Sequence, residues 1–508
     1  MDSNLDQEYR PLVGQFEGKQ FRNERRLFKG RRCLLAALLL AGTSLALFSN
    51  HQSNWKISST SLNTVAQFQK CSIDNFVATG FPFLDSAAPL PVSEYELRRN
   101  NLAVALEADG VDAFVVEPGY TFKYYANVSQ PEWEVWEPEE RPFLMIVQPV
   151  RNKENGRIEA GVKFLAPSFE VERARLLGMP FVNEPKFVPW EEHWNPYQTL
   201  LKSWDIAKGR PKIMVDDEMR DFIQRGLGEN GFEVLGLGGE VERVKQTKTQ
   251  REVEIVRAVN TGTVEAVRAM RKCLYPGLTE NEVMEVLDNT LRVAGMDPFF
   301  DIVLFGWFPY QKFHSILPTY KLLDEDASNP HGGTDGSKIL EAETFVLIDV
   351  GAHLYGYSSD ICRTFFPPFF PKPTTPYQFA ALSPMIQEKL SVWDIVLEAQ
   401  TQSMHNLVAG NSAASVDIAA RKVITDAGYG KDFTHRVGHG IGIKAHESPY
   451  LNKGNVNTTL RAGMTFTSEP GIYLVDKFGV RHEDILLVKE NGEPEILTGT
   501  RAVGPWDP

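Results

Sequence analysis

The chain has 508 residues, 43% of them hydrophobic, and a net charge of −13 at pH 7. This length exceeds the size at which a single hydrophobic core stops growing, so we expect two domains with additional segments. The negative charge, without a basic patch interleaved with aromatic residues, argues against a nucleic-acid partner.

The four cysteines form no disulfide framework. Cys71 and Cys273 are the only pair that is easy to imagine, and the sequence leaves open whether they form a bond.

The amino-terminal segment predicts a membrane anchor. Residues 1–32 are polar and end in a basic cluster, and the charge-free apolar run 33–48 follows. A run of this length can form a short spanning helix, and the basic flank favours an amino terminus in the cytoplasm. Cleavage of a secretory signal near Ala46 is the alternative. We therefore expect a tail over 1–32, a signal anchor over 33–49 and a polar stalk over 50–92.

This topology places the rest of the chain in the lumen or outside the cell. The protein would then be a single-pass type II membrane protein, or a secreted one if the segment is cleaved. In either case the sequons at Asn127 and Asn457 would accept glycans.

Residues 93–240 alternate between helical and strand patterns. Glu94–Ala108 is amphipathic at helical spacing, and the apolar runs Ala113–Glu117 and Phe143–Gln148 predict strands. This alternation is typical of an α/β unit. We therefore predict a first domain of this class over 93–240.

Residues 245–508 form a second predicted unit, which opens with two helices and continues in strands. Thr249 and Thr279 each precede a Glu by three residues, as in a capping box, and so begin the two helices. Asp301–Gly306 is the next predicted strand. The aromatic segment Trp307–Leu323 follows, and its role as a lid or a surface loop stays open.

Four carboxylates lie within apolar, strand-like runs of this second unit. Asp349 lies at the end of the run 343–351, and the others follow in similar surroundings: Asp360, Glu469 and Glu483. A buried carboxylate is costly unless it is paired or bound to a metal. These acids are therefore candidates for metal ligands, against the alternative of unrelated buried polar residues.

The segment 435–447 carries three histidines, His435, His439 and His446, among several glycines. Glycines disfavour a helix and let the main chain approach a ligand closely, so we predict an extended or looped backbone. Imidazole binds divalent transition metals, and oxygen-rich sites suit manganese. Four acids with one imidazole are the ligand set expected for a pair of divalent ions. The alternative is that these are ordinary loop histidines.

The chain resembles the pita-bread metallopeptidases, which include Xaa-Pro aminopeptidases, prolidases and methionine aminopeptidases. The resemblance extends to the sequences GHGIG at 438–442, SEPGIY at 468–473 and RHED at 481–484. Residues 93–240 resemble the amino-terminal domain of Xaa-Pro aminopeptidases, prolidases and creatinases. The resemblance implies an α+β fold, with a pita-bread catalytic domain over 245–508 preceded by a smaller α/β domain of creatinase type.

The resemblance also implies a dinuclear metal site. Asp349 would bind one ion, His439 and Glu469 the other, while Asp360 and Glu483 would bridge the two. The cofactor would be two divalent ions, with Mn²⁺ as the first candidate and Co²⁺ or Zn²⁺ as alternatives. A hydroxide between the ions would then be the nucleophile.

Other residues take roles around the ions by the same resemblance. Glu469 would carry a proton from water to the leaving proline nitrogen, and His446 would hydrogen-bond the substrate backbone beyond the scissile bond. His435 would line the proline side, and His331 would stabilise the oxyanion, although the preceding insertion leaves the position of His331 open. Arg481 would brace the ligands at the substrate site, with a plain surface arginine as the alternative.

The predicted function is hydrolysis of the bond between an amino-terminal residue and proline, in peptides with proline at the second position. Aminopeptidase and dipeptidase action are not separated by the sequence, because they depend on how the first domain and any neighbouring subunit close the pocket. A homodimer also stays open. Two alternatives remain: a pita-bread enzyme with other chemistry, such as a metal-dependent lyase or another C–N hydrolase, and a metal-free binding module.

Overall fold

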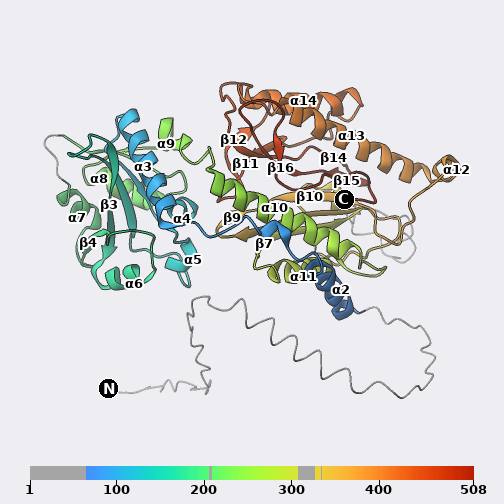
Figure 1. The fold of residues 1–508 in the computed structure, drawn as a ribbon, viewed down its shortest axis with the longest axis horizontal. Helices are drawn as coiled ribbons and strands as arrows, with labels where there is room; N and C mark the ends of the chain where they lie inside the picture. Colours follow the sequence, from blue (N-terminus) through green and yellow to red (C-terminus); the bar gives the residue numbers. More distant parts are fainter. Residues whose placement is uncertain (1–63, 205–208, 307–325, 333–334) are drawn as a thin grey trace, which may run out of the picture. The chain divides into compact units, whose positions relative to one another are not determined.

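The structure is a computed structural model that describes residues 64–204, 209–306, 326–332 and 335–508. These residues form a mixed α+β fold (Figure 1), and they belong to one compact unit, Asn63–Pro508. An amino-terminal sheet with its helices is followed by a carboxy-terminal part that carries all the predicted metal ligands.

A six-stranded sheet lies at the centre of the amino-terminal part. Along its strand β1 (Ala113–Val116), Phe114 and Val116 pack into one core, and Ala113 and Val115 into another. Because successive side chains of a strand point to opposite faces, both faces of this sheet are buried. In spatial order the strands are β4 (Lys186–Trp190), β3 (Ile158–Pro167), β2 (Leu144–Arg151), β1, β5 (Lys212–Val215) and β6 (Glu233–Leu235).

Helices cover the two faces of this sheet. One face packs against α3 (Val92–Asp109), α4 (Tyr120–Ala126), α5 (Gln130–Trp133), α6 (Val171–Leu176) and α9 (Gly239–Arg243). The other face packs against α7 (Pro196–Lys202) and α8 (Asp221–Glu229).

The carboxy-terminal part begins with two helices packed on a small sheet. Capping boxes at Thr249 and Thr279 begin α10 (Gln250–Arg271) and α11 (Glu280–Arg292), as predicted. Apolar residues of both helices share one core with the sheet. Its strands are β10 (Ile361–Phe365), β8 (Val346–Leu354) and β7 (Asp297–Phe305), in that order, and β9 (Tyr357–Ser358) pairs with β8.

A second, five-stranded sheet follows with its own helices. Its order is β12 (Glu447–Leu451), β11 (Gly438–Gly440), β13 (Thr465–Ser468), β16 (Asp484–Leu487) and β17 (Glu495–Ile496). A separate ribbon consists of β14 (Gly471–Leu474) and β15 (Phe478–Arg481). α13 (Pro384–Asn406) and α14 (Ala413–Asp426) share one core with these strands, and the short α12 (Pro376–Ala380) precedes them (Figure 1).

Part of the predicted stalk is a packed helix, α2 (Val65–Val77). A capping box at Thr64 begins it, and α2 lies beside α11 (Figure 1). Phe68 and Phe76 are buried in the core that α10 and α11 share. These phenylalanines are eight residues apart, so they lie close to one face of the helix. The polar composition of the segment hides this narrow apolar face.

A disulfide joins Cys71 of α2 to Cys273, which follows α10, with a Cα–Cα distance of 6.0 Å. The sequence left this pairing open, and the structure shows the bond. The two are 202 residues apart in sequence, and only the packing of α2 on α10 brings them together.

The membrane assignment also needs correction. The predicted tail and anchor, 1–49, lie outside the described residues. Among the residues that the structure describes, no helix is long and apolar enough to cross a membrane, and the long helices α10 and α13 carry charged side chains. The predicted type II topology, signal anchor, secreted alternative and glycosylation of Asn127 and Asn457 are not supported and are withdrawn.

Candidate metal centre

Strands from both sheets of the carboxy-terminal part bring the predicted ligands together. Asp349 lies on β8, and Asp360 directly precedes β10, the antiparallel neighbour of β8. His439 is the central residue of β11, Glu469 follows β13, and Glu483 lies between β15 and β16. Each is therefore placed by a strand or by the residue that ends or begins one.

The five residues, joined by His446, make three overlapping groups. Within each group the ligand atoms lie within 4.8 Å of one another, and the groups are Asp349 with Asp360 and Glu483, His439 with Glu469 and Glu483, and Asp360 with His439 and His446. Any of these groups could hold a metal ion.

His439 connects the carboxylates of the two sheets. Its Nε2 lies 3.5 Å from Oδ2 of Asp360 and 3.2 Å from Oε1 of Glu469. Its Nδ1 donates to the carbonyl oxygen of Gly440 over 3.0 Å, so Nε2 is the nitrogen that faces the acids. A Cβ at Gly438 would lie 2.2 Å from the carbonyl oxygen of Thr467, so glycine is required for β11 to approach β13 this closely.

Ionisation is unfavourable for three of the four carboxylates of the cluster, because they are buried close to other acids. Burial raises the pKa of Asp349, and burial together with the neighbouring acids raises the pKa values of Asp360 and Glu483 well above the ordinary range. Burial would also raise the pKa of Glu469, but the hydrogen bond and charge of His439 hold that pKa well below its usual value.

The donor set fits divalent cations. Oδ1 of Asp349 is buried and has no hydrogen-bond partner among the described residues. An orphaned buried acceptor is costly, and a cation at this position would satisfy it. Carboxylates with one imidazole are ligands that hard to borderline divalent ions prefer.

A series of contacts connects the cluster to Arg481, Tyr473 and His435. Arg481 pairs with Asp349 and donates to the Tyr473 hydroxyl over 2.9 Å. That hydroxyl lies 2.8 Å from Nε2 of His435. Arg481 is 1% exposed, so it is not a surface arginine. Its role in bracing the ligands stays a prediction. His435, predicted to line the proline side, contacts Tyr473 and is not among the residues that line the cavity.

A cavity of about 400 Å³ opens onto the cluster. His331 lines it, although the insertion at 307–323 that precedes this residue lies outside the described residues. His446 also lines it: its side chain is 55% exposed, and its Nε2 is 3.9 Å from Oδ2 of Asp360. Burial and the neighbouring His439 lower the pKa of His446 to about 4, so it is neutral at pH 7.

Further residues line the cavity that the sequence did not single out. They are Tyr120, Phe299, Phe300, Ile302, Lys444 and Ala445. Tyr120 comes from α4, more than two hundred residues before the metal ligands, and nothing local to it marks a site. Tyr473 was also missed, although its place within the matched SEPGIY sequence was a usable signal.

Comparison with known proteins agrees with this fold and site. Residues 254–490 match metallopeptidase family M24. An uncharacterized peptidase of Schizosaccharomyces pombe is 36% identical over 451 residues, which cover 88% of this chain and 90% of the relative. Among solved structures, dipeptidase PepE from Mycobacterium ulcerans has a TM-score of 0.64 at 25% identity, covering 81% of this chain and 98% of that one. Prolidase from Thermococcus sibiricus has a TM-score of 0.62 at 26% identity, covering 80% and 97%.

The fold is that of a metallopeptidase with the pita-bread architecture, and the cluster contains groups that could hold a metal ion. The chain belongs to metallopeptidase family M24. The predicted family and the predicted α+β fold are therefore confirmed. Membership supports a divalent-metal site at the acidic cluster and a peptide as substrate.

Proposed function

We propose that this protein is a dinuclear-metal exopeptidase that cleaves the bond between an amino-terminal residue and proline. The observation that carries the proposal is the way the ligand groups overlap. Of the four carboxylates, only Asp360 and Glu483 belong to two groups each, as bridging ligands would. Asp349 would then hold one ion, and His439 with Glu469 the other. Mn²⁺ is the first candidate because oxygen ligands predominate.

The chain's own residues supply the proton transfers. The cluster would hold divalent ions that, when bound, would acidify water and polarise the scissile carbonyl. Glu469 is ionised, because His439 holds its pKa low, so it can accept a proton and deliver it to the leaving nitrogen. His446 is neutral and half-exposed at the cavity, where its ring can donate a hydrogen bond to the substrate backbone. His331, at the same cavity, is the candidate donor to the oxyanion.

The apolar wall of the cavity supports proline at the second position. Phe299, Phe300 and Ile302 form an apolar surface beside the metal ligands. A proline ring is apolar and its nitrogen carries no hydrogen after a peptide bond forms, so the ring can pack there without leaving a donor unsatisfied. The prolidase of Thermococcus sibiricus, at 26% identity, also supports this specificity.

The test compares Xaa-Pro peptides with matched Xaa-Ala peptides. The purified chain is supplied with Mn²⁺, Co²⁺ or Zn²⁺ in turn, and release of the amino-terminal residue is measured. We expect release from the proline series alone, and we expect a chelator to stop it. Equal cleavage of both series, or cleavage that persists without metal, contradicts the proposal.

A further inference from the structure

Lys444 is the only lysine or arginine among the described residues that line the active-site cavity. It lies in the loop between β11 and β12, two residues before His446. The same cavity contains four carboxylates of the metal centre. A negatively charged group of a substrate would therefore find one cationic side chain there besides the bound metal.

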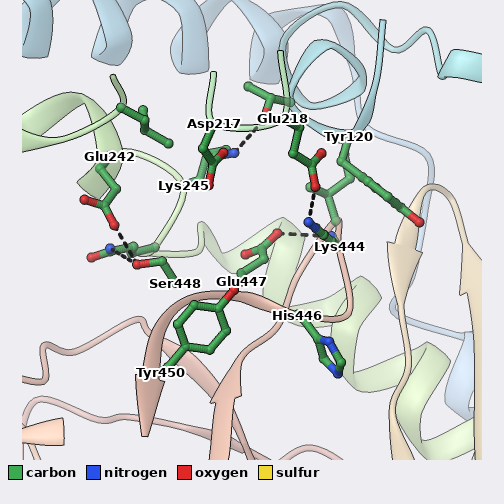
Figure 2. Close-up of a pocket in the computed structure, with 14 residues that line it drawn as sticks. Tyr120, Asp217, Glu218, Glu242, Lys245, Lys444, His446, Glu447, Ser448 and Tyr450 are labelled. Carbon is green, nitrogen blue, oxygen red and sulfur yellow. Dashed lines mark hydrogen bonds and ion pairs between the residues drawn. The ribbon is translucent and has the colours of Figure 1, made fainter. Parts of the chain in front are cut away.

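Glu218 of the amino-terminal part holds the Lys444 ammonium in an ion pair, beside the ring of Tyr120 (Figure 2). The Lys444 side chain is 37% exposed and that of Glu218 is 40% exposed. An ion pair this exposed contributes little free energy, and a lysine stem is flexible. Lys444 can therefore exchange Glu218 for another carboxylate at small cost.

Three other cations near the site are held by other contacts. The Lys245 ammonium, in the adjoining cavity, donates to the Thr121 hydroxyl over 2.6 Å and lies 4.0 Å from Oδ1 of Asp216. Arg481 is buried against Asp349. Arg436 packs on the ring of Tyr450, with its guanidinium carbon 4.5 Å from the ring centroid, and it is not among the residues lining the cavity.

The space beyond Lys444 is unfavourable for an anion. A smaller cavity of about 90 Å³ adjoins the first and shares Tyr120, Lys444 and His446 with it (Figure 2). Its lining includes four acids, Asp217, Glu218, Glu242 and Glu447, against two lysines, Lys444 and Lys245. A substrate carboxylate that reaches Lys444 would be repelled from going further.

We propose that Lys444 recognises the free carboxylate at the carboxy-terminal end of an Xaa-Pro dipeptide. In such a dipeptide the carboxylate is attached directly to the proline, so it enters the cavity with the ring. Lys444 is then the specificity-determining residue that favours dipeptides over longer peptides. This inference rests on the proposed Xaa-Pro specificity.

The experiment uses two substrates that differ only in the group concerned, Ala-Pro and its carboxy-terminal amide. The measured quantity is kcat/KM for the acid divided by kcat/KM for the amide, with Mn²⁺ supplied. Because a charge-assisted contact is lost, Lys444→Met should lower this ratio by about 10- to 100-fold. Lys444→Arg should recover most of it. Glu218→Gln should raise the ratio, because it frees the ammonium.

Arg436→Gln is the matched control, since it removes a nearby positive charge that does not line the cavity. Its ratio should stay near that of the wild type. An equal loss of both substrates in Lys444→Met, or an equal fall of the ratio in Arg436→Gln, overturns the assignment. Calorimetric binding of uncleavable analogues of the acid and the amide should show the same preference. If the wild type cleaves neither substrate, the proposed function fails, and this binding comparison still decides the role of Lys444.

Discussion

Glu483 and Asp484 are neighbours in the chain, and both are buried, but their surroundings are opposite. Burial would raise the pKa of Asp484, yet the guanidinium of Arg363, 2.6 Å away, holds it below its usual value. Gln400 donates a further hydrogen bond to Asp484. Glu483 faces Asp360 and the other acids instead, and its pKa is raised well above the ordinary range.

The comparison shows that a buried carboxylate can either be paired within the fold or form part of a ligand site. Asp484 is satisfied by the protein itself, so it contributes to the stability of the fold as long as Arg363 is present. Glu483 lies among like charges without an arginine or lysine in salt-bridge contact among the described residues. Its ionised form needs cations from outside the chain, and this marks a ligand site.

The largest expected effect is at the metal centre. Asp360→Ala should abolish peptidase activity with little unfolding, because Asp360 is proposed to bridge the two ions and its loss would release both. Glu483→Ala should behave in the same way. Activity and circular dichroism measured on the same preparations separate loss of function from loss of fold. Wild-type turnover by Asp360→Ala would contradict the bridging assignment.

Removing the partner of Asp484 should damage the fold instead. Arg363→Met leaves a buried carboxylate without its cation, and we expect a loss of about 3–5 kcal/mol in the free energy of unfolding. Added metal should not restore this loss, because Asp484 is not among the grouped ligands. Urea denaturation with and without Mn²⁺ provides the measurement, and a change below about 1 kcal/mol would show that the pair is not needed.

His446 should affect catalysis without affecting metal content. His446→Ala should lower turnover by about 10²-fold, as expected for a positioned hydrogen-bond donor. The geometry also allows a different role, since His446 shares a possible ligand group with Asp360 and His439. Metal analysis of the variant distinguishes the two roles, because loss of an ion would make His446 a ligand.

The smallest expected effect concerns pH and the metal-free chain. Asp349, Asp360 and Glu483 have raised pKa values in the folded state, so the folded chain keeps protons that the unfolded chain has released. Their contribution to stability is therefore present below the ordinary carboxyl range and is lost as pH rises through the raised values. The Tm of the metal-free chain should therefore fall as the pH rises from the ordinary carboxyl range through these raised pKa values.

Asp360→Asn is the matched variant for this effect, because it removes one charge without changing the shape. At neutral pH and without metal, its Tm should exceed that of the wild type, and with metal the order should reverse. A lower Tm than the wild type in both conditions would argue against charge repulsion in the cluster.

The clustering of the candidate metal ligands could be predicted from sequence because each one carries its own local context. His439 lies among glycines that a close approach requires, and Glu469 and Glu483 lie in matched motifs within apolar runs. The strand predicted to end at Gly351 continues to Leu354, since Ala352 and Leu354 are also buried. Asp349 is therefore within the strand rather than at its end.

Other features depend on contacts between distant segments, and no local pattern reports them. Tyr120 and Lys444 line one cavity although they are far apart in the chain. The bond between Cys71 and Cys273 likewise follows from the packing of a helix whose composition is polar. Such features require the positions of whole elements, which a single sequence does not provide.

The central claim is that this cluster binds two divalent ions. The most direct measurement is the metal content of each chain after equilibrium dialysis against Mn²⁺, for the wild type and for Glu483→Ala. We predict about two ions per wild-type chain and a loss of both ions in the variant, because Glu483 is a proposed bridge. A wild-type chain that binds one ion or none, or a variant that keeps two, would contradict the account.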